Sequence, residues 1–118
     1  MATRVLFHRV VQDAPEFGST ETRSVSRVFF DLVVDGETFK DLHVDVEERV
    51  GSTHKTEEIR VGDLKAALVP LDRDAFERAV RDYYQSLVTS AGFGKHLAKD
   101  KGFRTRGDEL ALEQVVEL

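Results

Sequence analysis

Three side chains that can bind metals or move protons alternate in the segment VFFDLVVDGETFKDLHVDV, residues 28–46. If this segment is extended, Asp41, His43 and Asp45 project to one face, about 6.6–6.8 Å apart along the strand. Imidazole together with carboxylate suits zinc or iron. A metal-dependent enzyme using Asp41, His43 and Asp45 as ligands is therefore one hypothesis. The polar outer face of a sheet is the other explanation for the same alternation.

The turn at Asp35-Gly36 decides which residues accompany this row, because Asp-Gly is a strong hairpin signal. A two-residue loop would pair even with odd positions and send the aliphatic rows of the two strands to opposite faces. A three-residue loop, 34–36, pairs even with even positions, so we predict that loop. One face of the hairpin then carries Val28, Phe30, Leu32, Val34, Leu42, Val44 and Val46.

The odd-numbered face of the hairpin is predicted to be mixed in character. Its large apolar residues, which stand among charges, are Val25, Phe29, Val33 and Phe39. The predicted register places Arg27 opposite His43, where it would repel a metal cation, and Phe29 opposite Asp41. Exposed aromatic residues grouped with polar ones indicate an interface. The predicted partner-binding residues are Arg27, Phe29, Phe39 and His43.

A basic segment near the end of the chain supports an alternative function. Five cations face one acid, Asp100, within residues 95–106, which gives this segment +4 and leaves −9 for the rest of a chain whose net charge is −5. Phe93 and Phe103 lie beside these cations and could stack on bases. The alternative is binding of an anionic ligand or nucleic acid through Lys95, Lys99, Lys101, Arg104 and Arg106, although the net acidity argues against nucleic acid.

The sequence contains no motif typical of other catalytic or binding chemistries. The chain has no cysteine, which removes thiol catalysis and disulfides. It has no G-x-S-x-G elbow, and the glycines of GFGKH and GSTHKT lack phosphate-loop spacing. His8 lies in an apolar segment, where we expect a hydrogen-bonded core or rim residue. We assign no catalytic residues and no cofactor.

The remaining elements follow from periodicity and capping residues. Residues 4–12 are predicted to form an interior strand, 13–24 a loop, and 56–61 a short strand with Ile59 and Val61 inward. The clearest helix begins after Asp72, a good N-cap, and carries its apolar residues at helical spacing. The tail ELALEQVVEL fits a helix or a strand. We favour a strand, because an otherwise helix-poor chain needs another strand for its sheet.

We therefore predict a single α+β domain spanning residues 1–118, with an antiparallel sheet of four to five strands and one main helix packed on its aliphatic face. The start MATRVLFHRV shows no secretion signal, and no apolar run approaches the ~20 residues that span a bilayer. The expected function is a small cytoplasmic binding or protein-interaction module, with a protein partner or self-association, rather than an enzyme.

Overall fold

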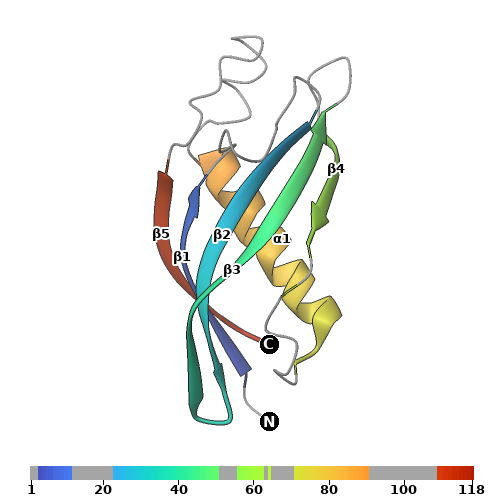
Figure 1. Ribbon diagram of the computed structural model, residues 1–118. Helices are drawn as coiled ribbons and strands as arrows, with labels where there is room; N and C mark the ends of the chain where they lie inside the picture. Colours follow the sequence, from blue (N-terminus) through green and yellow to red (C-terminus); the bar gives the residue numbers. More distant parts are fainter. Residues whose placement is uncertain (1–2, 12–22, 51–55, 63, 65–70, 91–108) are drawn as a thin grey trace.

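Five antiparallel strands and one helix make up the computed structural model, which describes residues 3–11, 23–50, 56–62, 64, 71–90 and 109–118 (Figure 1). The strand order in the sheet is β4-β3-β2-β1-β5. The predicted α+β class, with one helix on an antiparallel sheet, is confirmed. The elements are β1 (Thr3–Val11), β2 (Arg23–Val34), β3 (Glu37–Val50), β4 (Thr56–Val61), α1 (Arg73–Ser90) and β5 (Glu109–Glu117).

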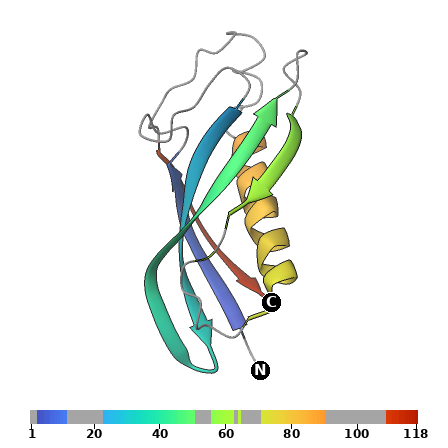
Figure 2. The same ribbon diagram turned by 45° about the vertical axis from the view of Figure 1, so that its right-hand side comes forward.

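The order of the strands places β1 between β2 and β5, as the interior-strand prediction required. The tail forms β5, so its strand interpretation is confirmed, and β5 lies at one edge of the sheet. β4 lies at the other edge, and its Val61 pairs with Val46 on the helix side. Figure 2 shows α1 against one side of this sheet.

The turn between β2 and β3 has two residues, so the predicted three-residue loop is wrong. Val34 pairs with Glu37, and both intervening residues have positive φ, 50° at Asp35 and 83° at Gly36. Positive φ at both central positions is the requirement of a type I′ turn, whose twist matches that of the strands it joins.

A β-bulge in β3 then restores the even-with-even pairing that burial of one face demands. Leu32 pairs with Phe39 but Phe30 pairs with Leu42, so Lys40 and Asp41 both stand opposite Asp31. Asp41 adopts a φ of 60°, and its backbone N–H donates to Oδ1 of Asp31 at 2.9 Å.

This bulge also changes the predicted cross-strand partners. Beyond it, Arg27 pairs with Asp45 and Phe29 pairs with His43, in place of the predicted Arg27–His43 and Phe29–Asp41 pairs. The prediction failed because a two-residue turn followed by one inserted residue shifts the partners by two positions relative to a three-residue turn.

A second bulge, at His8, changes which residues of β1 face the helix. Phe7 pairs with Phe30, but Arg9 pairs with Phe29. The inserted residue turns Val10 into the core, where it is 1% exposed. Strict alternation would instead have placed Val11 on the side of Val5 and Phe7, as the sequence pattern predicted.

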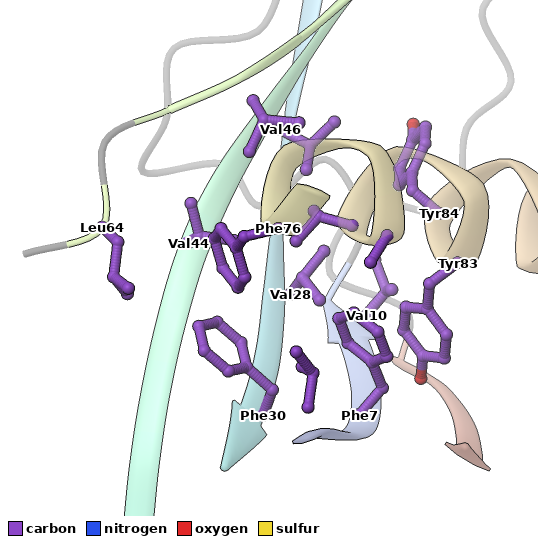
Figure 3. Close-up of a cluster of buried hydrophobic side chains, with 14 of the residues drawn as sticks. Phe7, Val10, Val28, Phe30, Val44, Val46, Leu64, Phe76, Tyr83 and Tyr84 are labelled. Atoms are coloured by element: carbon purple, nitrogen blue, oxygen red, sulfur yellow. The ribbon is translucent and has the colours of Figure 1, made fainter. Parts of the chain in front are cut away.

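The core lies between the aliphatic face of the sheet and α1 (Figure 3). The helix is capped as predicted, because the backbone N–H of Ala75 donates to Oδ1 of Asp72 at 3.2 Å. Phe7 stacks on Tyr83 with ring centroids 4.3 Å apart, and Phe30 packs on Phe76 at 5.3 Å. These aromatic pairs join the helix to β1 and β2.

Two adjacent tyrosines of α1 are both 1% exposed and reach two different strands of the sheet. The Tyr83 hydroxyl donates to the backbone O of Leu112 in β5 at 2.7 Å, and burial, aided by the charge of Glu113, raises the pKa of Tyr83 to about 12. The Tyr84 hydroxyl donates to Oε1 of the buried Glu48 in β3 at 2.6 Å. The helix is thus tied to an edge strand and to an inner strand by hydrogen bonds.

Candidate interaction face

The side of the sheet opposite α1 is called here the helix-free face, because no helix lies on it in the described part of the chain (Figures 1 and 2). Three rows of side chains cross it from strand to strand. They are partly exposed and combine aromatic, aliphatic and charged groups: Leu6, His8, Arg9, Val11, Arg27, Phe29, Asp31, Val33, His43 and Asp45.

The first row has Phe29 at its centre. The Arg9 guanidinium carbon lies 4.0 Å from the centroid of the Phe29 ring, and the His43 ring centroid lies 5.9 Å from it on the other side. Arg9 also pairs with Glu109 of β5, with Nε 2.5 Å from Oε1. An aromatic ring under a guanidinium is held by cation–π attraction. Phe29 is therefore a fixed, partly exposed ring rather than a free side chain.

The second row is a chain of polar groups across four strands at the positions of the two bulges. His8 places Nδ1 2.8 Å from Oε2 of Glu113 in β5 and Nε2 3.1 Å from Oδ2 of Asp31 in β2. Asp31 in turn accepts the backbone N–H of Asp41 in β3. The hydrogen bond to Glu113, together with Asp31, raises the pKa of His8 above 6.5 despite desolvation, which lowers it.

The third row borders a shallow hollow. Arg27 Nε lies 2.9 Å from Oδ1 of Asp45. Next to this pair is a space of about 240 Å³, lined by Val25, Asp45, Glu47, Arg60 and Gly62. The N–H of Gly62 donates to the backbone O of Asp45 at 2.8 Å, and a Cβ at Gly62 would stand 3.1 Å from that oxygen. The hollow is thus bounded by side chains of both charges, and a larger residue at Gly62 would make a tight contact with the backbone at its edge.

Three of the four predicted partner-binding residues lie together on this face, and the fourth does not. Arg27, Phe29 and His43 occupy neighbouring positions of β2 and β3. Phe39 pairs with Leu32 and packs against the hydrophobic core, so its predicted place on the mixed face is wrong. The cause is the two-residue turn, which reverses the parity of every β3 residue between the turn and the bulge.

The hypothesised metal ligands are not gathered into a site. Asp41 occupies the bulge with a positive φ, and Asp45 is paired with Arg27. Across the described ranges there is no group of three or more His, Asp or Glu side chains that could hold a metal ion. Asp41, His43 and Asp45 therefore alternate because they belong to the outer side of a strand, and the bulge interrupts this alternation at Asp41.

The residues of the alternative, anion-binding hypothesis, Lys95, Lys99, Lys101, Arg104 and Arg106, lie outside the described residues, as does most of the predicted loop at 13–24. No helix in the described part of the chain combines the length and apolar character needed to span a membrane.

Sequence reasoning did not identify Arg9, Glu109 and Glu113 as parts of this face. The prediction that His8 is a hydrogen-bonded core or rim residue is confirmed by its two carboxylate contacts. Its partner Glu113 is 105 positions away in the chain. No local pattern could have paired them, because both strands must first align and both must bulge at this point.

No protein-family model, curated protein or solved structure matches this chain. The geometry of the helix-free face is thus the basis for assigning a function.

Proposed function

We propose that this protein is a small binding module that recognises a protein partner through the helix-free face, with Phe29 at the centre of the contact and Arg27 and His43 beside it. The observation that carries the proposal is the fixed, partly exposed Phe29 ring between Arg9 and His43, on a sheet face without a helix in the described residues. An aromatic centre inside a charged rim is the usual anatomy of a binding hot spot.

The arrangement supports binding in two ways. Completing the burial of Phe29 contributes part of the roughly 1.5–3 kcal/mol that burying a whole Phe side chain provides. The ring is held in place before any partner arrives, so little side-chain entropy is lost on binding. The flanking pairs Arg9–Glu109 and Arg27–Asp45 are already formed and present both charges to a partner.

The partner is a separate protein or a second copy of this chain, and the test below distinguishes them. The proposal includes a cytoplasmic location, which is supported by the absence of cysteine from the chain.

The test compares Phe29→Glu with Gln85→Glu, which adds the same charge at an exposed position of α1. Light scattering after size-exclusion chromatography gives the oligomeric state, and affinity capture gives partner binding. Phe29→Glu alone is used, because Phe39→Glu would place a charge against the core. Thermal unfolding verifies that each variant is folded.

A dimer that becomes monomeric only in Phe29→Glu identifies self-association. A monomer whose captured partner is lost at least tenfold only in Phe29→Glu identifies a separate protein. If folded Phe29→Glu behaves as Gln85→Glu does in both measurements, the proposal is wrong.

A further inference from the structure

We propose that the outer edge of β5 pairs with an extended basic peptide of a partner protein, which would add a sixth strand to the sheet. This inference is independent of the role proposed for Phe29. β5 pairs with β1 along its whole length, up to the bond from the Leu118 N–H to the Thr3 carbonyl oxygen at 2.8 Å. No described strand pairs with its other side (Figure 1).

An edge of this kind is a template for another strand. β5 runs for nine residues, Glu109–Glu117. Its outward N–H and C=O groups repeat along that length, and such rows are recognised by peptides that add a strand through main-chain hydrogen bonds. Proteins usually shorten, charge or cover edge strands, and the acidic side chains of β5 are a device of this kind against pairing of like strands.

The exposed large apolar side chains of the described residues also lie on β5. Within the described ranges, the large hydrophobic residues that are exposed are Leu112, at 41%, and Val115, at 59%. Both belong to this strand. An added strand would cover them from the side, which gives a peptide apolar contact in addition to main-chain bonds.

The acidic side chains of β5 favour a basic peptide as the strand that pairs with this edge. Glu109, Glu113 and Glu117 recur every four residues, and all three lie on the helix-free face: Glu109 pairs with Arg9, Glu113 with His8, and Glu117 stands opposite Arg4. The side chains of Glu109 and Glu113 remain 52% and 78% exposed.

A second copy of β5 is a poor partner for this row. Antiparallel pairing centred on residue 113 would set Glu113 against itself and Glu109 against Glu117. Centring on residue 111 or 115 would again set one glutamate against another. Centring on residue 112 or 114 would avoid direct opposition but would place glutamates of the two copies on the diagonals of the pair, within reach of each other. Like charges directly opposite one another destabilise a strand pair, so a strand with Lys or Arg at the matching positions is the complementary occupant.

The experiment uses the full chain and four nine-residue peptides. One alternates Lys and Val, and one has Glu in place of Lys. The other two are Lys–Val peptides N-methylated on one or the other set of alternate amides. Calorimetry measures affinity, and backbone amide shifts in NMR spectra locate the binding.

The Lys–Val peptide is expected to bind with its largest shifts in β5, and the Glu–Val peptide at least tenfold more weakly. One N-methylated peptide is expected to lose binding and the other to keep it, because alternate amides point to opposite edges of a strand. Val115→Lys is expected to weaken binding at least tenfold, and the matched Gln85→Lys to change it less than twofold.

The proposal is overturned if the Lys–Val peptide does not bind, if the Glu–Val peptide binds equally well, or if both N-methylated peptides bind as their parent does. It is also overturned if the amide shifts lie away from β5 or if Val115→Lys binds the Lys–Val peptide with normal affinity. Val115→Lys is expected to leave partner capture through Phe29 unchanged. The loss of partner capture in Phe29→Glu and the loss of peptide binding in Val115→Lys, with partner capture retained, therefore report on the two proposals separately.

Discussion

His8 lies between the carboxylates of Glu113 and Asp31, and both favour its protonated form. Its pKa in the folded protein is raised above 6.5, chiefly by the Glu113 hydrogen bond. The stabilisation by protonated His8 is therefore fully present below pH 6.5 and is lost as pH rises through the folded pKa. We predict that His8→Gln removes this part of the pH dependence, as measured by thermal unfolding between pH 5.5 and 8.5.

His43→Gln is the control for this measurement, because it removes a histidine from the same face and leaves the bridge between β5, β1 and β2 in place. The Tm of the wild type and the Tm of His43→Gln should fall by the same amount between pH 5.5 and pH 8.5. An identical Tm profile for His8→Gln and the wild type would show that the bridge contributes nothing.

Gly36 has a φ of 83° and nothing within 4 Å of the position of an added Cβ. Replacement by alanine therefore meets no neighbour and costs only the conformational energy of a left-handed residue with a side chain, about 1 kcal/mol. Asparagine tolerates this conformation better than alanine does. We predict that Gly36→Ala lowers the free energy of unfolding in urea by about 1 kcal/mol and that Gly36→Asn lowers it by less. Equal losses would contradict this account.

Sequence reasoning located this turn but not its length. The Asp-Gly pair marked the hairpin, and the aliphatic rows correctly required even-with-even pairing over most of it. The structure meets the requirement with an inserted residue at Asp41, stabilised by a hydrogen bond to Asp31 on the neighbouring strand. Because that bond forms only after the strands pair, parity alone could not separate a longer turn from a tight turn followed by a bulge, and Phe39 was placed on the wrong face.

At the level of elements, α1 is joined to the sheet by two tyrosine hydroxyls in different surroundings. Tyr83 bonds a carbonyl of the edge strand β5 in a partly buried place, whereas Tyr84 bonds the carboxyl of Glu48 in a buried one. Water can replace the first donor more readily than the second. We predict that Tyr83→Phe lowers the free energy of unfolding by about 0.5–1 kcal/mol and Tyr84→Phe by about 1–3 kcal/mol.

Denaturant unfolding of the two variants measures this difference, and each variant is the other's control, since both remove one hydroxyl from the same helix. A larger loss for Tyr83→Phe would show that the bond to β5, rather than the one to Glu48, is the main polar attachment of the helix.

The positions of the elements were more predictable than their contacts. Asp72 and the apolar spacing that follows it located α1, and the parity of the tail identified β5. The sequence pattern assigned Tyr83 to the core and Tyr84 to its flank, yet both are buried, because Glu48 provides an acceptor inside the core. The alternation of apolar and polar residues does not indicate that a glutamate on the aliphatic face of a strand is buried. Glu48 could therefore not be predicted as the partner of Tyr84.

At the scale of the whole molecule, the helix is shorter than the sheet that it covers. An 18-residue helix extends about 27 Å, whereas the 14 residues of β3 extend at most about 43–44 Å. The β2–β3 hairpin accordingly projects beyond α1 (Figure 2). One layer of helix thus protects one face of the sheet, while the rows around Phe29 and His8 occupy the other and meet the edge strand β5 at Glu109 and Glu113.

The salt dependence of binding distinguishes this face from the alternative anion site. Contact through Phe29 is mainly apolar, and its attached ion pairs are internal to the chain. We predict that partner binding lost in Phe29→Glu changes less than about threefold between 50 and 200 mM NaCl. Five phosphate contacts through the basic segment would instead weaken binding by roughly several hundredfold over that range. Calorimetry at both salt concentrations measures the difference. Replacing all five cations of residues 95–106 by Gln should leave binding through Phe29 intact, whereas its loss together with a steep salt response would assign recognition to the basic segment.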